Sequence, residues 1–545
     1  MPLNIYVTEQ GDTLRKIADR YYCELENLLS LNPHISNSDL NLAADVQIKL
    51  PAPLLHVRRI NDDVDSRPPE PSGTPLDQWI PLTSIEQMAQ TDYDVLIVGS
   101  GAGGGAALWR LCEQWGQNGK KIGMIEAGDL LLPTHAFHVP TFDEQRALDY
   151  LDRVSDRIGE RWPNFRSAKI VRGLGGRTLI WYAWAPRFDP SAFRTWPITY
   201  KELAPYYLIA EKVMNVTTQY NKGSSLQEIL IERLLTGGFP EATDVPLATD
   251  LEGTKYGQVH SNVYFSSIDF LAYALNIRKY DLAVNTRAVQ ILTEKGKATG
   301  VKVMTADNKS LTLTAKTIVV SASTWETPRL LLNSNIPGEA IGKYLVFHPV
   351  FHGFGTVNRD LFPEVLGSAT VFVPGTAERN YQLQVFNDYW YDYKEIPLLK
   401  KYPLEVHGYG IVEPRADNFV SLDPIHRDAY GVPKLNVQFS FSDKDQVLLR
   451  ELHASLSDFS AAAGLSLDGP LELQKPGADN HEAGTCRMGD NPATSVTNRY
   501  GQVNGITGLY IADMSVLNLT SPSNPTLTAV ALAIRTADHI VAQMK

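Results

Sequence analysis

Apolar residues recur with the spacing of short helices and strands from the start of the chain. In residues 1–51, "NIYV" predicts a strand and "VQIKLP" predicts a second strand that closes the segment. Between them, two helical faces are predicted by Leu14, Ile17, Ala18 and Tyr21 and then by Leu25, Leu28 and Leu29. The order strand, helix, helix, strand predicts a small folding unit.

The pattern changes twice further along the chain. Residues 52–91 hold no sustained period and are rich in Pro, Asp and Ser, which predicts an extended linker. From about Tyr93 near-continuous apolar strands alternate with amphipathic helices, the pattern of an α/β fold. A chain of 545 residues is too long for one simple core, so several folding units are expected.

The first of these strands leads into a glycine-rich turn. "YDVLIVGSGAGGGAALWRL" holds a buried strand, then Gly99, Gly101 and Gly104 in G-x-G-x-x-G spacing, then a helix. A second strand, "KIGMI", ends in Glu126, 22 positions after Gly104. Such a turn brings backbone N–H groups and a helix N-terminus to a pyrophosphate, and the acid can accept from ribose hydroxyls. The segment therefore predicts a dinucleotide site.

Charge and cysteine content narrow the classes of function. A formal net charge of −11 argues against a large nucleic-acid footprint. Three cysteines are too few for a disulfide framework, and Cys486 is expected to be a buried core residue. The N-terminus lacks the pattern of a secretory signal, and no apolar run approaches the roughly 20 residues of a membrane span. A cytoplasmic protein without a membrane span is expected.

Residues 1–51 resemble a LysM module through "YVTEQGDTLRKIADRYY", "LLSLNP" and "VQIKLP". The resemblance implies a groove for glycans that contain N-acetylglucosamine. Docking to a protein partner is the alternative and is slightly favoured, because no export signal precedes the module.

Residues 92–545 resemble the glucose-methanol-choline (GMC) family of FAD-dependent oxidoreductases. The likeness rests on the glycine turn, "RGLGGRTLIWYAWAPRF", "NTRAVQIL", "SASTWETPRLLLNSN", "HEAGTCRMG" and the C-terminal "SPSNPTLTAVALAI". It implies an α/β fold with a Rossmann-like FAD-binding domain at residues 92–190, 281–345 and 481–545. A substrate-binding domain of α+β type with a mixed sheet is implied at residues 191–280 and 346–480.

The resemblance also implies which residues contact FAD. The expected set is Gly99, Gly101, Gly104, Glu126, Gly175, Gly176, Thr178, Val289, Asp513, Asn524, Pro525 and Thr526. Ile180 occupies the place where some members carry a histidine bonded to the flavin, so non-covalent FAD is expected.

The catalytic pair implied by the family is His481 and Asn524. Oxidation of an alcohol removes a proton from oxygen and a hydride from carbon, and a neutral imidazole suits the first task near neutral pH. His481 is therefore the expected base, and the amide of Asn524 the expected hydrogen-bonding partner of the same hydroxyl. Asn524 and Pro525 further predict a helix start, with Asn as N-cap and Pro at the first helical position.

The sequence offers fewer signals for the substrate than for the cofactor. Gln438 could hydrogen-bond a polyol, and Trp390 and Tyr391 could stack on a sugar ring, so an alcohol or carbohydrate substrate is expected. The sequence does not identify the electron acceptor. His348 and His352 have no acidic or cysteine neighbour in the sequence, so no metal site is expected. Two alternatives stay open: a lyase or photodecarboxylase on the same scaffold, and a LysM-based glycan-binding or assembly protein with a vestigial flavin domain.

Overall fold

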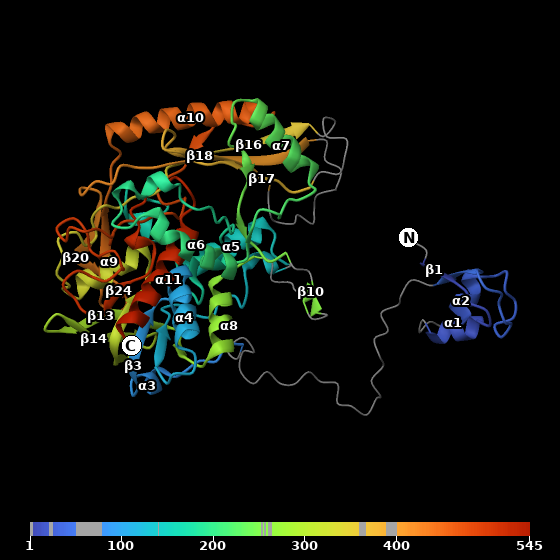
Figure 1. The fold of residues 1–545 in the computed structure, drawn as a ribbon, viewed down its shortest axis with the longest axis horizontal. Coiled ribbons are helices and arrows are strands. Elements are labelled where there is room, and N and C mark those ends of the chain that lie inside the picture. The colour runs from blue at the N-terminus through green and yellow to red at the C-terminus, as the bar shows by residue number, and fades with distance from the viewer. Residues whose placement is uncertain are drawn as a thin grey trace. The chain divides into compact units, whose positions relative to one another are not determined.

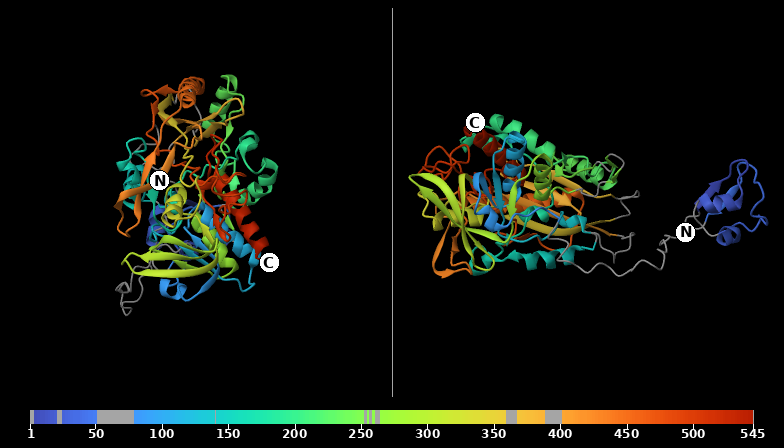
Figure 2. Two further views of the ribbon diagram at one scale, coloured as in Figure 1. Left: turned by 90° about the vertical axis from the view of Figure 1, so that its left-hand side faces the viewer. Right: turned by 90° about the horizontal axis from the view of Figure 1, so that it is seen from below.

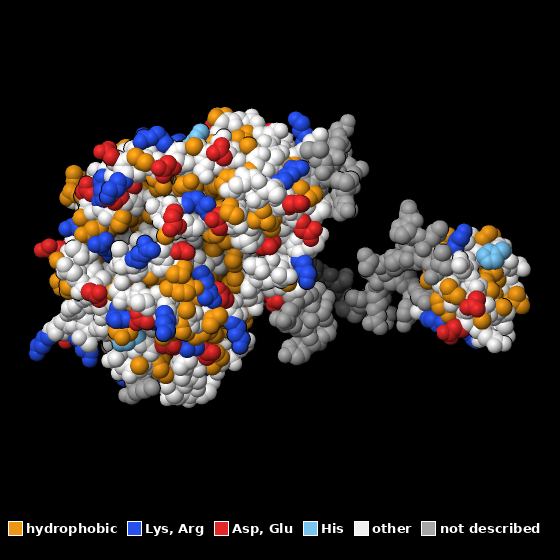
Figure 3. Space-filling model, turned by 45° about the horizontal axis from the view of Figure 1, so that its top comes forward, with side chains coloured by type: hydrophobic (Ala, Val, Ile, Leu, Met, Phe, Trp, Pro, Cys, Tyr) orange, Lys and Arg blue, Asp and Glu red, His pale blue; other side chains and the backbone are white. Residues whose placement is uncertain are grey.

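The computed structural model describes residues 4–20, 25–50, 79–139, 141–251, 254–255, 258–259, 264–358, 367–387 and 401–544. The chain divides into two compact units, residues 1–72 and residues 73–545. Within the described ranges, none of the helices has the length and apolar character needed to span a bilayer. On the face of the larger unit seen in Figure 3, acidic and basic side chains are interspersed with apolar ones.

The small unit has the predicted order of elements. It consists of β1 (Asn4–Val7), α1 (Leu14–Arg20), α2 (Leu25–Leu31) and β2 (Gln47–Leu50). The two strands pair antiparallel, with Asn4 opposite Leu50. The predicted helical faces supply Leu14, Ile17, Ala18 and Leu28 to its core, which Ile35, Leu42 and Ile48 complete. The predicted Tyr21 lies outside the described residues.

The predicted linker differs from the structure at its C-terminal end. Residues 52–78 lie outside the described part, but residues 79–91 include α3 (Ile85–Met88), capped by the Ser84 side chain. Ile85 and Met88 are buried in the core of the larger unit. These two apolar residues, three positions apart, lie on one helical turn. A pattern of two residues is too short to distinguish a helix from irregular chain in the sequence.

The first sheet of the larger unit carries the glycine turn. Its order is β12-β4-β3-β15-β14-β13, with β24 paired to β15. β12, β4, β3, β15 and β24 run parallel, while β13, β14 and β15 form an antiparallel meander. The bounds are β3 (Asp92–Val98), β4 (Ile122–Ile125), β12 (Asp281–Ala283), β13 (Thr286–Glu294), β14 (Lys297–Thr305), β15 (Ser310–Val320) and β24 (Leu509–Ile511).

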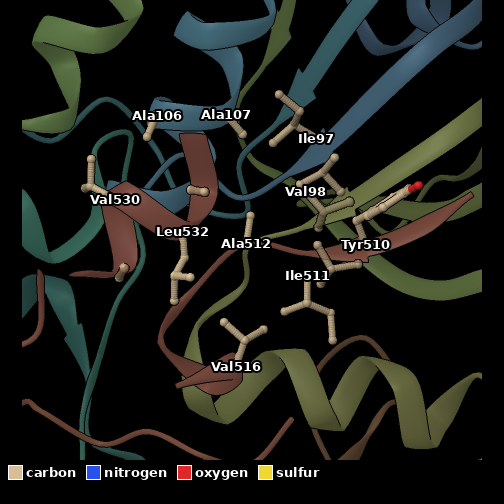
Figure 4. Close-up of a cluster of buried hydrophobic side chains, with 14 of the residues drawn as sticks. Ile97, Val98, Ala106, Ala107, Tyr510, Ile511, Ala512, Val516, Val530 and Leu532 are labelled. Carbon is tan, nitrogen blue, oxygen red and sulfur yellow. The ribbon is translucent and has the colours of Figure 1, made fainter. Parts of the chain in front are cut away.

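Helices cover this sheet and form one core with it. α4 (Ala102–Trp115) packs against α8 (Ser267–Ile277) and the C-terminal α11 (Thr526–Gln543) (Figure 1). Figure 4 shows where α4, α11, β3 and β24 meet, through Ala106, Ala107, Val530, Leu532, Ile97, Val98, Tyr510 and Ile511. The first and last elements of the larger unit are thus joined by one core.

The second sheet lies at the opposite end of the larger unit (Figures 1 and 2). Its order is β22-β16-β19-β18-β17-β8, with β23 paired to β16. α10 (Asp443–Ala463) and α7 (Ser225–Thr236) pack on it. The bounds are β8 (Thr243–Asp244), β16 (Val350–Asn358), β17 (Thr370–Val373), β18 (Tyr381–Phe386), β19 (Lys401–Gly410), β22 (Ser466–Leu467) and β23 (Glu472–Leu473).

The strand β19 separates the two sides of this sheet. Leu404 and Val406 are buried in the core shared with α10, and a Cβ on Gly408 would come within 2.8 Å of Leu452 in α10. The intervening residues, Glu405 and His407, point to the other side. One face of the strand therefore builds the core, and the other is free to line a site.

Shorter elements complete the larger unit. The helices are α5 (Glu144–Val154), α6 (Tyr200–Val213) and α9 (Ser323–Asn333). The strands are β5 (Ser155–Asp156), β6 (Ile170–Val171), β7 (Val216–Thr217), β9 (Leu247–Ala248), β10 (Thr254–Lys255), β11 (Gln258–Val259), β20 (Phe419–Arg427) and β21 (Pro433–Gln438). The boundaries of the two expected domains within this unit stay a prediction.

The close approach of α4 to β24 generates a stability prediction. A Cβ on Gly103 would lie 1.7 Å from the carbonyl oxygen of Ala512. In Gly103→Ala the backbone of α4 must therefore move away from the backbone that follows β24. We expect a loss of about 2–3 kcal/mol, the size of other overpacked sites, despite the better helix propensity of alanine. Denaturant unfolding followed by tryptophan fluorescence measures it. Gly469→Ala, with no atom within 4 Å of the new Cβ, is the matched control and should change stability by less than about 0.5 kcal/mol. Equal stability of the two variants would contradict the packing argument.

Candidate active site

A single cavity of about 580 Å³ runs from the glycine turn to the C-terminal block. It brings together most of the residues expected from the sequence. The predicted residues that line it are Gly99, Gly101, Glu126, Gly176, Thr178, Val289, His481, Asp513, Asn524 and Thr526. Gly104, Gly175 and Pro525 are not among the described lining residues.

The turn between β3 and α4 is held by backbone contacts. Gly99 has φ +98°, and a Cβ there would lie 2.2 Å from the carbonyl oxygen of Ser321. A Cβ on Gly104 would lie 2.0 Å from the carbonyl oxygen of Gly99, so this glycine lets the turn close beneath the cavity. Gly101 precedes α4 as its N-cap, and a Cβ on it would have no atom within 4 Å. Its missing side chain therefore leaves open space at a helix N-terminus, as an approaching diphosphate requires.

Ser100 connects this turn to its neighbours. Its hydroxyl donates to Glu126 Oε2 at 2.7 Å and accepts from the Gly175 N–H at 3.0 Å. Its carbonyl oxygen accepts from the Ser267 hydroxyl at 2.7 Å. One serine thus ties together the ends of β3 and β4, the glycine loop after β6 and the start of α8.

Glu126 has a structural role that its sequence spacing did not indicate. Besides the Ser100 hydroxyl, it accepts from the backbone N–H of Ser100 at 3.1 Å and of Gly128 at 2.9 Å. Burial raises the pKa of this carboxyl group, while those hydrogen bonds oppose the rise. A carboxylate has about four acceptor positions, so a ribose hydroxyl can still share it.

The second glycine loop lies directly beside the first. Gly175 and Gly176 both have positive φ, and a Cβ on Gly176 would lie 3.3 Å from the Cα of Gly101. The Thr178 hydroxyl donates to the Gly175 carbonyl and accepts from the Ser267 N–H. Thr178 therefore fixes this loop from within while it lines the cavity.

Val289 lies on the first sheet and Asp513 just beyond it. The pairing of β13 with β14 shifts register between Ala288 and Gln290, so Val289 stands outside the ladder, and its carbonyl oxygen accepts from Asn333 Nδ2 at 2.7 Å. Asp513 follows β24 and accepts from Ser515, Ser323 and Thr327. Both of its oxygens are thus bound, and burial raises its pKa.

These features fit a bound dinucleotide such as FAD. Two glycine loops leave room where side chains would stand, a helix N-terminus points to that room, and the buried carboxyl of Glu126 lies beside it. Ser323 Oγ is buried, lines the same cavity and has no partner among the described residues. A ligand hydroxyl, carbonyl or phosphate oxygen in the cavity could pair with it.

Asn524 differs from the expectation in its local role. α11 begins at Thr526, and the N-cap is Pro525 rather than Asn524. The Asn524 Oδ1 instead accepts from Gln382 Nε2 at 2.9 Å and Gln384 Nε2 at 3.1 Å, both on β18. With its oxygen held by two donors, Asn524 keeps its Nδ2 group for a ligand in the cavity that the residue lines.

His481 is paired with a second histidine that the sequence reasoning set aside. The two Nδ1 atoms of His481 and His348 lie 3.0 Å apart, and His348 Nε2 lies 2.9 Å from the carbonyl oxygen of Ser521. Burial lowers the pKa of His348 to about 4, so this imidazole is neutral at neutral pH. The pairing joins residues 133 positions apart, and no local pattern predicts it.

The hydrogen-bond chain fixes the tautomer of His481. A carbonyl oxygen only accepts, so His348 carries its proton on Nε2 and its Nδ1 is an acceptor. His481 must then donate from its own Nδ1, which leaves its Nε2 unprotonated. Because His481 lines the cavity, this Nε2 is the group available as a base.

The surroundings of His481 also favour its neutral form. Burial lowers its pKa most, followed by the positive charges that His348, Arg177 and His407 can carry. Arg177 forms an ion pair with the buried Glu482 at 2.7 Å. Burial, reinforced by Glu482, raises the pKa of Asp479, whose Oδ2 accepts the backbone N–H groups of both His348 and His481.

Of the three expected substrate residues, the structure describes only Gln438. Gln438 is exposed at the end of β21 and is not among the described lining residues, while Trp390 and Tyr391 lie outside the described residues. Other side chains that line the cavity are Trp181, Tyr182, Trp184, Gln384, Phe386, Glu405, His407 and Tyr409, and the centroid of the Tyr409 ring lies 5.5 Å from that of the His481 ring. In the sequence, the alternation of "LEVHGYG" places Glu405, His407 and Tyr409 on one face of a strand, and this pattern could have indicated them. Cys486 is buried, as expected.

Comparison with known proteins agrees with this geometry. The family of GMC oxidoreductases matches residues 93–350 and 414–533, and the LysM domain family matches residues 6–51. The 2-methyl-1,2-propanediol dehydrogenase of Mycolicibacterium austroafricanum is 26% identical and is covered over 95% of its length by 82% of this chain. The C-glycoside 3-oxidase of Arthrobacter globiformis is 25% identical, and the match covers 95% of that protein and 83% of this chain. The structure of Aspergillus oryzae formate oxidase shares the fold, with a TM-score of 0.61 at 16% identity over 98% of that chain and 83% of this one.

The open space at Gly101 leads to a prediction about cofactor content. Gly101→Val places a side chain where a diphosphate would approach the backbone, at a position where the added Cβ meets no protein atom within 4 Å. We expect the purified variant to fold with little flavin, measured as the ratio of absorbance at about 450 nm to that at 280 nm. Gly469→Val is the matched control and should keep its flavin. Full flavin content in Gly101→Val would exclude Gly101 from the cofactor cradle.

Proposed function

We propose that this chain, which belongs to the GMC oxidoreductase family, oxidises the CH–OH group of an alcohol, specifically of a sugar or glycoside, with non-covalently bound FAD. The observation that carries the proposal is the position of His481 and Asn524. Both side chains line the cavity that begins at the glycine turn, and the unprotonated nitrogen of His481 is left free by its pairing with His348. Ile180 lines the same cavity and has no nucleophile to bond to a flavin.

FAD, when bound, supplies the acceptor for the hydride that leaves the alcohol carbon. His481 Nε2 takes the hydroxyl proton, and Asn524 Nδ2 donates a hydrogen bond to the same oxygen as it becomes a carbonyl. The positive charge then on His481 is shared through its Nδ1–H bond to His348, a charge-assisted bond stronger than the neutral one. The N-terminus of α11 favours negative charge at this end of the cavity.

The wall of the cavity supports a carbohydrate as substrate. Trp184 and Phe386 offer apolar ring surface, and Gln384, Glu405 and His407 offer hydrogen-bonding groups beside it. Apolar faces between fixed polar groups suit a sugar ring, which has CH faces and a hydroxyl rim. The names of the relatives, a propanediol dehydrogenase and a C-glycoside oxidase, point to polyhydroxylated substrates.

The LysM unit adds a binding function to this proposal. Its family suggests a glycan that contains N-acetylglucosamine, and a protein partner is the alternative. The LysM unit, which has its own core, would hold the oxidoreductase close to that glycan or protein.

Replacement of His481 tests the proposed base. His481→Ala should keep its flavin but slow anaerobic reduction by a sugar or polyol about 10²–10⁴-fold, as loss of a general base implies. In the wild type the rate should stay level down to pH 6.5 and fall only at lower pH, because burial lowers the pKa of His481 below its usual value. Stopped-flow bleaching near about 450 nm measures both. Equal rates in His481→Ala and wild type would remove His481 from the reaction, and no bleaching by any alcohol in the wild type would favour a non-oxidising flavoenzyme.

Replacement of His348 tests the tautomer argument. His348→Phe removes the acceptor of the His481 Nδ1 proton and leaves a buried N–H unpaired, which costs about 1–3 kcal/mol, equivalent to about 5–160-fold in kcat. We expect KM to change little, and His348→Gln, whose amide oxygen can accept, to recover part of the rate. Steady-state kinetics at neutral pH separates kcat from KM. A loss confined to KM, or no recovery with glutamine, would count against it.

A further inference from the structure

Two histidines and a glutamate gather on the cavity side of the second sheet. His352 on β16 stands directly opposite His407 on β19, and Glu405 lies two residues from His407 on the same face. The ring centroids of the two histidines are 6.2 Å apart, and one ligand atom from each of the three residues lies within 4.8 Å of the others. The acid that His352 lacks in the sequence is thus supplied by the neighbouring strand.

We propose that His352, Glu405 and His407 bind a divalent transition-metal ion, with Zn²⁺ the ion that suits them best. Two imidazoles and one carboxylate are a recurrent zinc ligand set that leaves a fourth position open. With bonds of about 2.1 Å, tetrahedral ligand atoms lie about 3.4 Å apart, so rotation of the side chains is enough to close the cluster around an ion.

The surroundings of the three residues support a cation. His407 Nε2 lies 2.5 Å from Glu405 Oε1, so an ion would replace the proton that these two atoms share. His407 Nδ1 lies 3.1 Å from the Tyr409 hydroxyl, which would accept its proton and orient the ring, as partners of ligating histidines commonly do. Glu472 is opposite His352 on β23, and its carboxylate lies 4.0 Å from His352 Nε2.

Two carboxylates stand beside the histidines, Glu405 at 2.5 Å from His407 Nε2 and Glu472 at 4.0 Å from His352 Nε2. The carboxylates of Glu405 and Glu472 together carry two negative charges, which a divalent ion would neutralise. A simple ion pair between His407 and Glu405, two residues apart on β19, is the alternative that the experiment must separate.

The position of the cluster gives the ion access to the substrate cavity. Glu405 and His407 line this cavity, whereas His352 is not among its described lining residues. An open coordination position on this side could accept hydroxyl oxygens of a polyol. The metal site itself does not depend on the proposed oxidation, because its test measures metal rather than turnover.

Metal binding to the flavin-loaded full chain tests the proposal. The protein is purified without a polyhistidine tag, treated with a chelator, desalted and titrated with ZnCl₂ by isothermal titration calorimetry. Elemental analysis after gel filtration counts the metal retained. We expect one Zn²⁺ per chain at a saturable site, and a thermal midpoint that rises with Zn²⁺ because the ion binds the folded state.

His352→Ala is the main variant, because it removes a ligand that does not line the cavity. We expect Zn²⁺ affinity to fall about 100-fold or more, since even outer partners of metal ligands contribute 10–100-fold. The thermal shift should vanish with it. Glu405→Gln should weaken binding in the same direction.

His426→Ala is the matched control, because it removes a histidine that pairs with a carboxylate, Asp423, elsewhere on the surface. It should bind Zn²⁺ like the wild type. Flavin absorbance and the metal-free thermal midpoint confirm that each variant is folded. No saturable Zn²⁺ binding in the wild type, or unchanged affinity in His352→Ala, would overturn the proposal and leave the ion pair between His407 and Glu405.

Discussion

Direct contact of backbone with backbone at the end of β3 is the constraint on which the active site depends. Side chains at Gly99 and Gly103 would collide with carbonyl oxygens of Ser321 and Ala512, so these glycines let β15 and β24 approach the first turn. Because β24 ends at the cavity, the segments beside it in sequence, which carry His481 and Asn524, are delivered there too. A residue near position 100 and residues near position 500 thereby share one site.

The chemistry at the other end of the cavity depends on balanced charge. His481 is surrounded by groups that disfavour its protonation, yet its backbone N–H is anchored by Asp479, and Arg177 is neutralised by Glu482. In the proposed reaction the imidazole is therefore a weak base at rest, and its hydrogen bond to His348 strengthens when it accepts a proton. Such an arrangement favours the charge that develops during reaction over the charge of the resting state.

Local sequence patterns predicted the helices and strands well, but they could not predict contacts between residues far apart in the chain. The LysM-like order and the strand, turn and helix around Gly99 follow from short periods, and family resemblance pointed to His481 and Asn524. The partner His348 could not be found this way, because its bond to His481 spans 133 residues. Glu405 meets His352 only through the register of β16 and β19, and the Asn524 side chain bonds to β18 instead of capping its helix. In each case the decisive neighbour came from another strand.

The alternation along β19 has a consequence for how this protein could diversify. Residues 404, 406 and 408 hold the strand to α10, while residues 405, 407 and 409 face the cavity. If the proposed function holds, changes in the second set would alter the preference for substrate while the core contacts of the first set stay in place. A directed-evolution library confined to those three odd-numbered positions would therefore explore new specificities at small risk of misfolding.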